Sequence, residues 1–208
     1  EAINKKAGRK LLPSIVVGLS LIALVWFTLS YQREIFAIVV AVAVILGVRE
    51  LVRAFSARGI VISFNGLTLA AIGLSYAAWV GGVAGLAVAT AIAFPLLLIR
   101  ALLQGPEGFV AKATATTFGL LYLPFLAGFL ILLARPSTGF QRVMTFVVLV
   151  GCNDTFGYIV GVLLGKHPLV PKISPKKTWE GLLGSLIFTM IGGALAFTYI
   201  MDMDWWIG

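Results

Sequence analysis

The sequence predicts an all-α integral membrane protein that crosses the bilayer about seven times. Hydrophobic residues make up 60% of the 208 residues. The mean hydropathy of +1.04 is far above the usual value for soluble proteins. The apolar residues also fall into long runs that match the length of a membrane-spanning helix. A water-soluble globular domain is therefore excluded.

Seven apolar runs are the predicted spans, because turn-forming or charged residues separate them. They cover residues 13–30, 35–48, 67–80, 83–103, 114–134, 143–164 and 178–201. The Gly81-Gly82 pair predicts a tight turn between the third and fourth spans, and Pro95 and Pro124 predict kinks. We divide the chain into a scaffold of five spans, residues 1–142, and a helical hairpin, residues 143–208, that carries the candidate site.

Basic residues are distributed unevenly between the two sides of these spans, and the net charge is +8. With the N-terminus in the cytoplasm, 13 of the 16 Lys and Arg residues lie on the cytoplasmic side, and Arg33, Arg135 and Arg142 lie on the other. This bias predicts a multi-pass protein of the cell membrane with its N-terminus and basic loops in the cytoplasm. The cations alternate with apolar spans, so anionic membrane lipids are the expected partners and nucleic acid is not.

A carboxylate, Asp154, lies inside the apolar run 143–164. An acid near the centre of a bilayer costs about 2.5–3.5 kcal/mol on insertion scales, so it is rarely left facing lipid. Two interpretations stay open. Asp154 could hydrogen-bond helices together with Asn153 and Thr155, or it could be a metal, proton or substrate site, which is the usual role of acids inside membranes.

The same helix has a face of small residues. Asp154, Gly157, Gly161 and Gly165 follow one another at intervals of three or four residues, so they lie on one side of a helix. Glycines at this spacing allow a neighbouring helix to approach closely. We therefore expect the Asp154 carboxylate to point into the helix bundle.

The basic loop that follows, KHPLVPKISPKKTWEG, contains Lys166, Lys172, Lys176 and Lys177. Ser174-Pro175 predicts an N-cap followed by the first residue of a helix. That helix would carry two lysines beside free backbone donors, which suits a bound phosphate. The alternative is a positive-inside loop that only contacts anionic headgroups.

Residues 151–184 resemble the phosphatidate cytidylyltransferases, the CDP-diacylglycerol synthases. The resemblance is carried by two motifs: Asp154-Thr155-Phe156-Gly157-Tyr158 with Gly161 and Gly165, and Lys166-His167 followed by Ile173-Ser174-Pro175-Lys176-Lys177-Thr178-Trp179-Glu180-Gly181. Members of this family carry a further motif downstream, Lys-Asp, then Pro-Gly-His-Gly-Gly, then Asp-Arg. The 208 residues do not contain it, so we expect residues outside this sequence to complete the site and the chain alone to be an incomplete enzyme.

The resemblance implies transfer of a cytidylyl group from CTP to phosphatidate in phospholipid biosynthesis, with Mg²⁺ as cofactor and a homodimer as the assembly. It implies four catalytic residues, of which the first is also the metal ligand: Asp154, Lys176, Lys177 and Glu180. It implies five substrate-binding residues: Lys172, Ser174, Thr178, Lys166 and Asn153. Glu180 is expected to pair with a lysine or to reach the metal through water, and His167 to be structural.

Three other functions stay open. A CTP-dependent polyprenol or dolichol kinase would share the architecture and the nucleotide but phosphorylate an alcohol. An ion-coupled transporter would also use kinked helices around an acid, although the basic loop would then have no evident role. A non-catalytic scaffold is the third.

Overall fold

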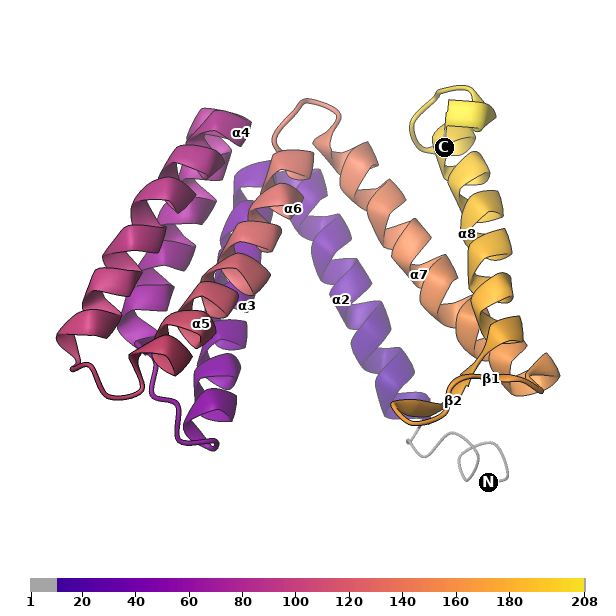
Figure 1. Ribbon diagram of the computed structural model, residues 1–208. Coiled ribbons are helices and arrows are strands. Elements are labelled where there is room, and N and C mark those ends of the chain that lie inside the picture. Colours follow the sequence, from indigo (N-terminus) through magenta and orange to yellow (C-terminus); the bar gives the residue numbers. More distant parts are fainter. Residues whose placement is uncertain (1–10, 208) are drawn as a thin grey trace. The chain divides into compact units, whose positions relative to one another are not determined.

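The computed structural model describes residues 11–207 as helices and one short β-hairpin (Figure 1). The chain separates into two compact units, one up to Gly139 and one from Phe140 onwards, and each is described by itself. Residues 1–10, with the predicted cytoplasmic N-terminus and Lys5, Lys6, Arg9 and Lys10, lie outside the described residues.

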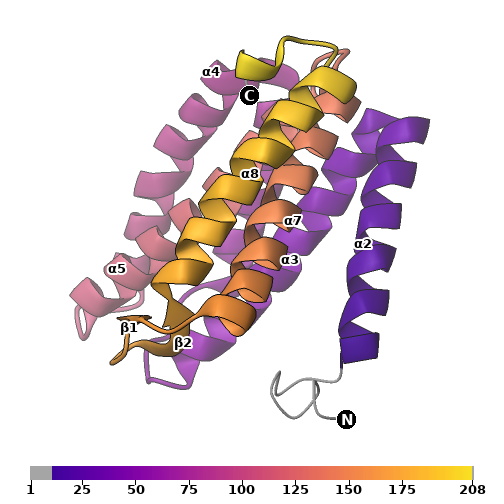
Figure 2. The same ribbon diagram turned by 90° about the vertical axis from the view of Figure 1, so that its right-hand side faces the viewer.

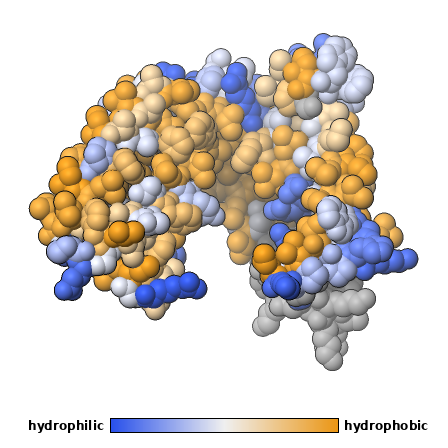
Figure 3. All heavy atoms as spheres, in the orientation of Figure 1, coloured by the Kyte–Doolittle hydropathy of each residue, from blue (hydrophilic) through white to orange (hydrophobic). Residues whose placement is uncertain are grey.

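Five of the described helices are long and apolar enough to cross a membrane. They are α3 (Arg33–Ser56), α4 (Phe64–Leu103), the continuous helix Phe109–Ala134, α7 (Gly139–Leu164) and α8 (Trp179–Tyr199). Helix α2 (Leu11–Tyr31) precedes them. Hydrophobic residues cover most of the visible helix surface (Figure 3), so the prediction of an all-α membrane protein is confirmed.

Helix α4 folds back on itself at the predicted glycine turn. Gly82 has φ 64° and ψ −146°, which is far from helical geometry and favours glycine. A straight helix of 40 residues would be about 60 Å long. Yet Arg100, near its end, donates through Nε to the Oγ of the N-cap residue Ser63 at 2.7 Å. The two halves of α4 therefore run antiparallel, side by side (Figure 1).

Pro124 produces a local change of helix type. The helix Phe109–Ala134 consists of α5 (Phe109–Leu120), a π-helical turn η1 (Leu121–Phe125) that contains Pro124, and α6 (Leu126–Ala134). Proline has no N–H and cannot complete the α-helical hydrogen-bond pattern, so one wider turn interrupts it. Helix α4, in contrast, continues through Pro95.

Two arginines bind backbone carbonyls at the Gly82 end of the first unit. Arg135 donates to Trp79 O from Nε at 2.7 Å and to Val80 O from Nη2 at 3.1 Å. Arg33 Nη1 donates to Arg135 O at 2.8 Å and also to Pro136 O. Carbonyls at helix C-terminal ends lack intrahelical donors and carry partial negative charge. The two guanidinium groups therefore hold the turn in α4 to the ends of α6 and α3.

The second unit is a pair of helices, α7 and α8, joined by strands β1 (Pro168–Val170) and β2 (Ser174–Thr178) and lying side by side (Figure 2). The helices meet through glycines, as the sequence predicted. A Cβ atom on Gly181 would lie 2.8 Å from Gly157 O, and one on Gly184 would lie 2.6 Å from Val160 Cβ. Further along, Phe156 stacks on Phe188 with ring centroids 4.0 Å apart.

Candidate functional site

A β-hairpin between α7 and α8 carries the lysines of the basic loop. β1 and β2 pair antiparallel, with Pro168 opposite Thr178 and Val170 opposite Ser174. All four lysines are exposed: Lys166, Lys172, Lys176 and Lys177. Lys166 lies between α7 and β1, and the other three lysines lie on the hairpin. Four cations are thus present at one end of the helix pair, which is where a membrane-bound enzyme would meet anions from water.

The predicted helix start at Ser174-Pro175 is wrong. Ser174 belongs to β2, and α8 begins at Trp179 with Thr178 as its N-cap. Thr178 Oγ1 accepts from Gly181 N–H at 3.2 Å, which is the usual N-cap interaction. The acid Glu180 therefore occupies the first helical turn, where it matches the helix dipole. Lys176 and Lys177 precede the helix, so they do not form a phosphate site in its first turn.

Lys176 and Lys177 lie instead in an irregular part of the hairpin. Between the two paired positions, β2 contains Pro175, Lys176 and Lys177, whereas β1 contains Leu169 alone. Such a bulge locally redirects side chains, and bulges are common next to active sites. The irregular strand fits a role for these lysines in binding a ligand.

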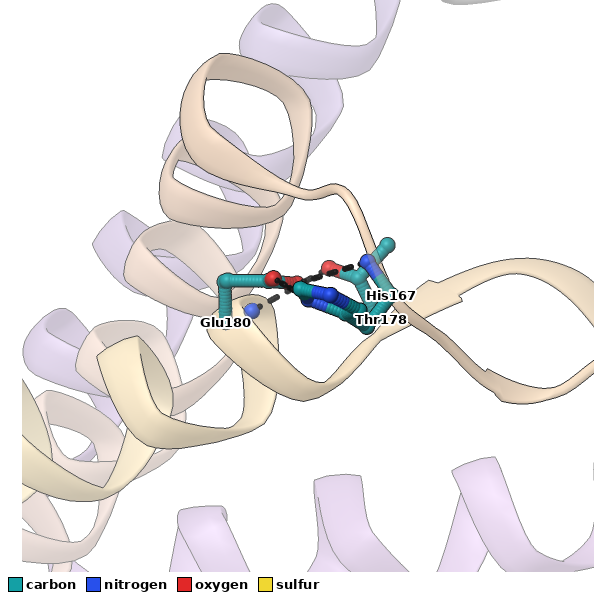
Figure 4. Close-up of polar contacts among 4 residues, drawn as sticks. His167, Thr178 and Glu180 are labelled. Atoms are coloured by element: carbon teal, nitrogen blue, oxygen red, sulfur yellow. Dashed lines mark hydrogen bonds and ion pairs between the residues drawn. The ribbon is translucent and has the colours of Figure 1, made fainter.

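The base of the hairpin is held by His167 and Glu180 (Figure 4). His167 Nδ1 and Glu180 Oε1 are 2.6 Å apart, and His167 N–H donates to Glu180 Oε2 at 3.3 Å. Trp179 N–H donates to His167 O at 3.0 Å. The expected pairing of Glu180 with a lysine is therefore not found in residues 11–207. The His167–Glu180 pair could not be predicted from the sequence alone. Knowledge of the strand register would have placed the two residues next to each other.

Asp154 is exposed and does not join the glycine face, so the expectation that it points into the helix packing is wrong for the α7–α8 pair. Its carboxylate accepts from Asn153 Nδ2 at 3.3 Å. The residues of α7 that contact α8 follow one another at intervals of four. Rows with this spacing are inclined to the helix axis, so the contact moves around α7 along its length. At the level of Asp154 the contact has reached Phe156 and Cys152, which contact Phe188 and Gly192.

Asp154 is well separated from the end of α7 at which the lysine-bearing segment begins. Asp154 lies ten residues before Leu164, the last residue of α7, which corresponds to about 15 Å of helix axis. Among the described residues, no group of three or more His, Cys, Asp or Glu side chains could hold a metal ion. Mg²⁺ needs only one or two carboxylates when substrate phosphates and water supply its other ligands, and the exposed Asp154 carboxylate fits that mode.

Comparison with known proteins gives consistent matches. Residues 13–208 match the sequence profile of the cytidylyltransferase family. A phosphatidate cytidylyltransferase from Mycobacterium leprae is 33% identical over 219 residues, which cover 98% of this chain and 70% of that protein. One from Mycobacterium bovis is 31% identical, covering 99% and 71%. One from Aquifex aeolicus is 40% identical over 84 residues, covering 40% of this chain and 32% of that protein.

Proposed function

The chain belongs to the cytidylyltransferase family, and from this we propose that it is a nucleotidyltransferase that makes CDP-diacylglycerol in phospholipid biosynthesis. The substrates are CTP and phosphatidate. A phosphate oxygen of phosphatidate bonds to the α-phosphorus of CTP, and the bond from that phosphorus to the oxygen bridging the β-phosphate breaks. Pyrophosphate leaves with the electron pair. The structural observation that supports the proposal is the lysine-bearing hairpin between two membrane-length helices.

The lysines have a clear task in this reaction, because both substrates are anions that repel each other. Lys176 and Lys177 bind phosphate oxygens, while Lys172 and Lys166 add positive charge around them. Fixed cations of this kind lower the barrier by orienting the phosphates and by stabilising the charge that develops. Neither a covalent enzyme intermediate nor a protein nucleophile is required. Ser174, on the same strand, is proposed to supply a hydroxyl to these phosphates.

Mg²⁺ is the proposed cofactor, and Asp154 is its proposed protein ligand, with Asn153 beside it as a polar contact for substrate. When bound, the ion would neutralise phosphate charge and hold phosphate oxygens in place. Asp154 is available for this because, within residues 11–207, its carboxylate accepts a side-chain hydrogen bond only from the neighbouring Asn153. Glu180, in contrast, is engaged by His167.

We propose seven membrane crossings, with α2 and each half of α4 counted as separate spans. The folded α4 supports this count, because its ends meet at Ser63 and Arg100. Charge supports a cytoplasmic hairpin. In the second unit, the hairpin end has four cations and the opposite end has Arg142. In the first unit, the end near Ser63 has five cations and the opposite end has Arg33 and Arg135. We also propose a homodimer, which both the glycine-rich helix faces and the family resemblance allow, and chemical cross-linking would test it.

The proposal is tested by measuring CDP-diacylglycerol formation from labelled CTP, phosphatidate and Mg²⁺ in liposomes, using the protein at its full natural length. Lys176→Ala/Lys177→Ala should lower kcat/KM about 100-fold or more, since charged hydrogen bonds contribute about 1.5–3 kcal/mol each. The matched control is Arg49→Ala/Arg58→Ala, which removes two exposed cations from the first unit and should keep activity. Full turnover in the lysine variant would contradict the phosphate assignment.

Offering a polyprenol in place of phosphatidate separates the proposal from the kinase alternative. A phosphorylated alcohol with no CDP-diacylglycerol would establish a CTP-dependent kinase. Ion flux in liposomes without nucleotide consumption would establish a transporter. Both results would leave the family membership intact and refute the proposed substrate.

A further inference from the structure

We propose that His167 is a positioning residue that acts through Glu180: the pair fixes the two ends of the lysine-bearing hairpin and so sets the affinity of the protein for CTP. The kinetic part of this inference rests on the proposed function, whereas its structural part does not. His167 itself need not touch a substrate.

The pair joins the two places where the hairpin leaves the helices. His167 directly precedes β1, and Glu180 is the second residue of α8. Both carboxylate oxygens of Glu180 are used, one by the His167 ring and one by the His167 N–H. The bond from Trp179 N–H to His167 O closes the same end of the hairpin through the backbone. Three hydrogen bonds therefore connect the first residue of the hairpin to the start of α8.

The hairpin needs such a connection because its own pairing is weak. Its strands have three and five residues, and an isolated two-stranded hairpin is marginally stable in water. The bulge that contains Lys176 and Lys177 interrupts the pairing further. The remaining order must come from the ends, where Glu180 belongs to the first turn of α8.

The geometry also assigns the two ring nitrogens of His167 different surroundings. Nδ1 faces the Glu180 carboxylate, to which it donates when it carries the proton. The side chain of His167 is 77% exposed, whereas that of Glu180 is 24% exposed. The carboxylate therefore faces the protein and the outer edge of the ring faces the surroundings. This arrangement is expected when the role of the ring is to hold the carboxylate in position.

A double-mutant cycle tests whether the two residues act as one unit. The variants are His167→Ala, Glu180→Ala and the combination, in the full-length protein, with kcat and KM for CTP as readouts. Each single variant should raise KM for CTP about five- to tenfold, with a smaller change in kcat, as expected for a charged hydrogen bond that is partly exposed. The combination should be within about twofold of the worse single variant. Additive effects would overturn the proposal, because Glu180 would then act without His167.

Two further substitutions identify the atom that matters. The side-chain amide of His167→Asn can donate from about the position of Nδ1, whereas that of His167→Gln reaches the position of Nε2. Asn should therefore recover most of the CTP affinity and Gln should not. The reverse result would mean that the outer edge of the ring contacts a substrate, and would refute the positioning role. Met190→Ala, at a 75% exposed site on α8, is the neutral control.

A readout without catalysis separates this inference from the proposed function. Trypsin cleaves after lysine, and Lys172, Lys176 and Lys177 are exposed on the hairpin. Cleavage there should be at least about fivefold faster in His167→Ala and Glu180→Ala than in the natural protein, at unchanged melting temperature. Unchanged cleavage would refute the positioning role. If the natural protein made no CDP-diacylglycerol, the proposed function would fail while the cleavage rates still decided the role of His167.

Discussion

The tightest contact between α7 and α8 makes a quantitative prediction for Gly184→Ala. The new Cβ would lie 2.6 Å from Val160 Cβ and Cγ2 and 2.8 Å from its Cγ1. Carbon atoms pack best at about 3.5–4.0 Å, so the helices must separate by about 1 Å. Val160 is β-branched and cannot move its Cβ away by rotating. Overpacking of this kind costs about 1–3 kcal/mol, which corresponds to about a 5- to 150-fold loss in the folding equilibrium constant.

Reversible unfolding in mixed detergent micelles would measure this loss. Gly151→Ala is the matched control, because it lies on α7 with nothing within 4 Å of the added Cβ and has the same change in helix propensity. A second variant, Val160→Gly/Gly184→Ala, moves the small residue to the other helix and should recover part of the loss. If Gly184→Ala were as stable as Gly151→Ala, the helices would not be in the contact described, and the reasoning would be refuted.

Three other predictions concern single positions. Gly82→Ala should lower stability by about 1–3 kcal/mol, because Gly82 has positive φ and its new Cβ would lie 3.0 Å from Arg135 Nη1. Thermal unfolding would measure this loss of stability, with Gly73→Ala as the neutral control. Thr178→Ala should cost about 1 kcal/mol by removing the α8 N-cap, and Thr178→Ser should restore it. Asp154→Asn should lower kcat/KM at least about tenfold and raise the Mg²⁺ concentration needed for half-maximal activity, and an unchanged Mg²⁺ titration would refute its metal role.

The helices could be predicted because their signals are local. Apolar runs, the Gly81-Gly82 pair and Pro124 each mark a feature that the structure shows at the same place. The glycine face of α7 could also be predicted, because helical spacing alone puts Gly157 and Gly161 on one side. The same spacing did not predict that Asp154 lies outside the α7–α8 contact. It assumes that the contact runs parallel to the helix axis, whereas the partner helix crosses at an angle and leaves that face within two turns.

The hairpin could not be predicted because its structure depends on the register between two short strands, which a local signal at one position does not reveal. Ser174-Pro175 is a good local signal for a helix start, but Ser174 pairs with Val170 in the hairpin instead. The helix begins only after the next capping residue, Thr178. The His167–Glu180 pair spans 13 residues and requires the strand register to be known. The lysines were identified correctly as exposed cations, while the element that carries them was not.

The separation of Asp154 from the hairpin leads to a last prediction. About 15 Å of helix lies between Asp154 and the end of α7, and an extended lysine side chain covers less than half of that distance. If Asp154 and Lys177 hold different phosphate groups, Asp154→Asn and Lys177→Ala should affect CTP binding independently, with free-energy changes that add within about 0.5 kcal/mol. Equilibrium binding of CTP to both single variants and the combination would measure this. A coupling of more than about tenfold would mean that both residues act on one phosphate group, and that the hairpin must bend toward Asp154 when the nucleotide binds.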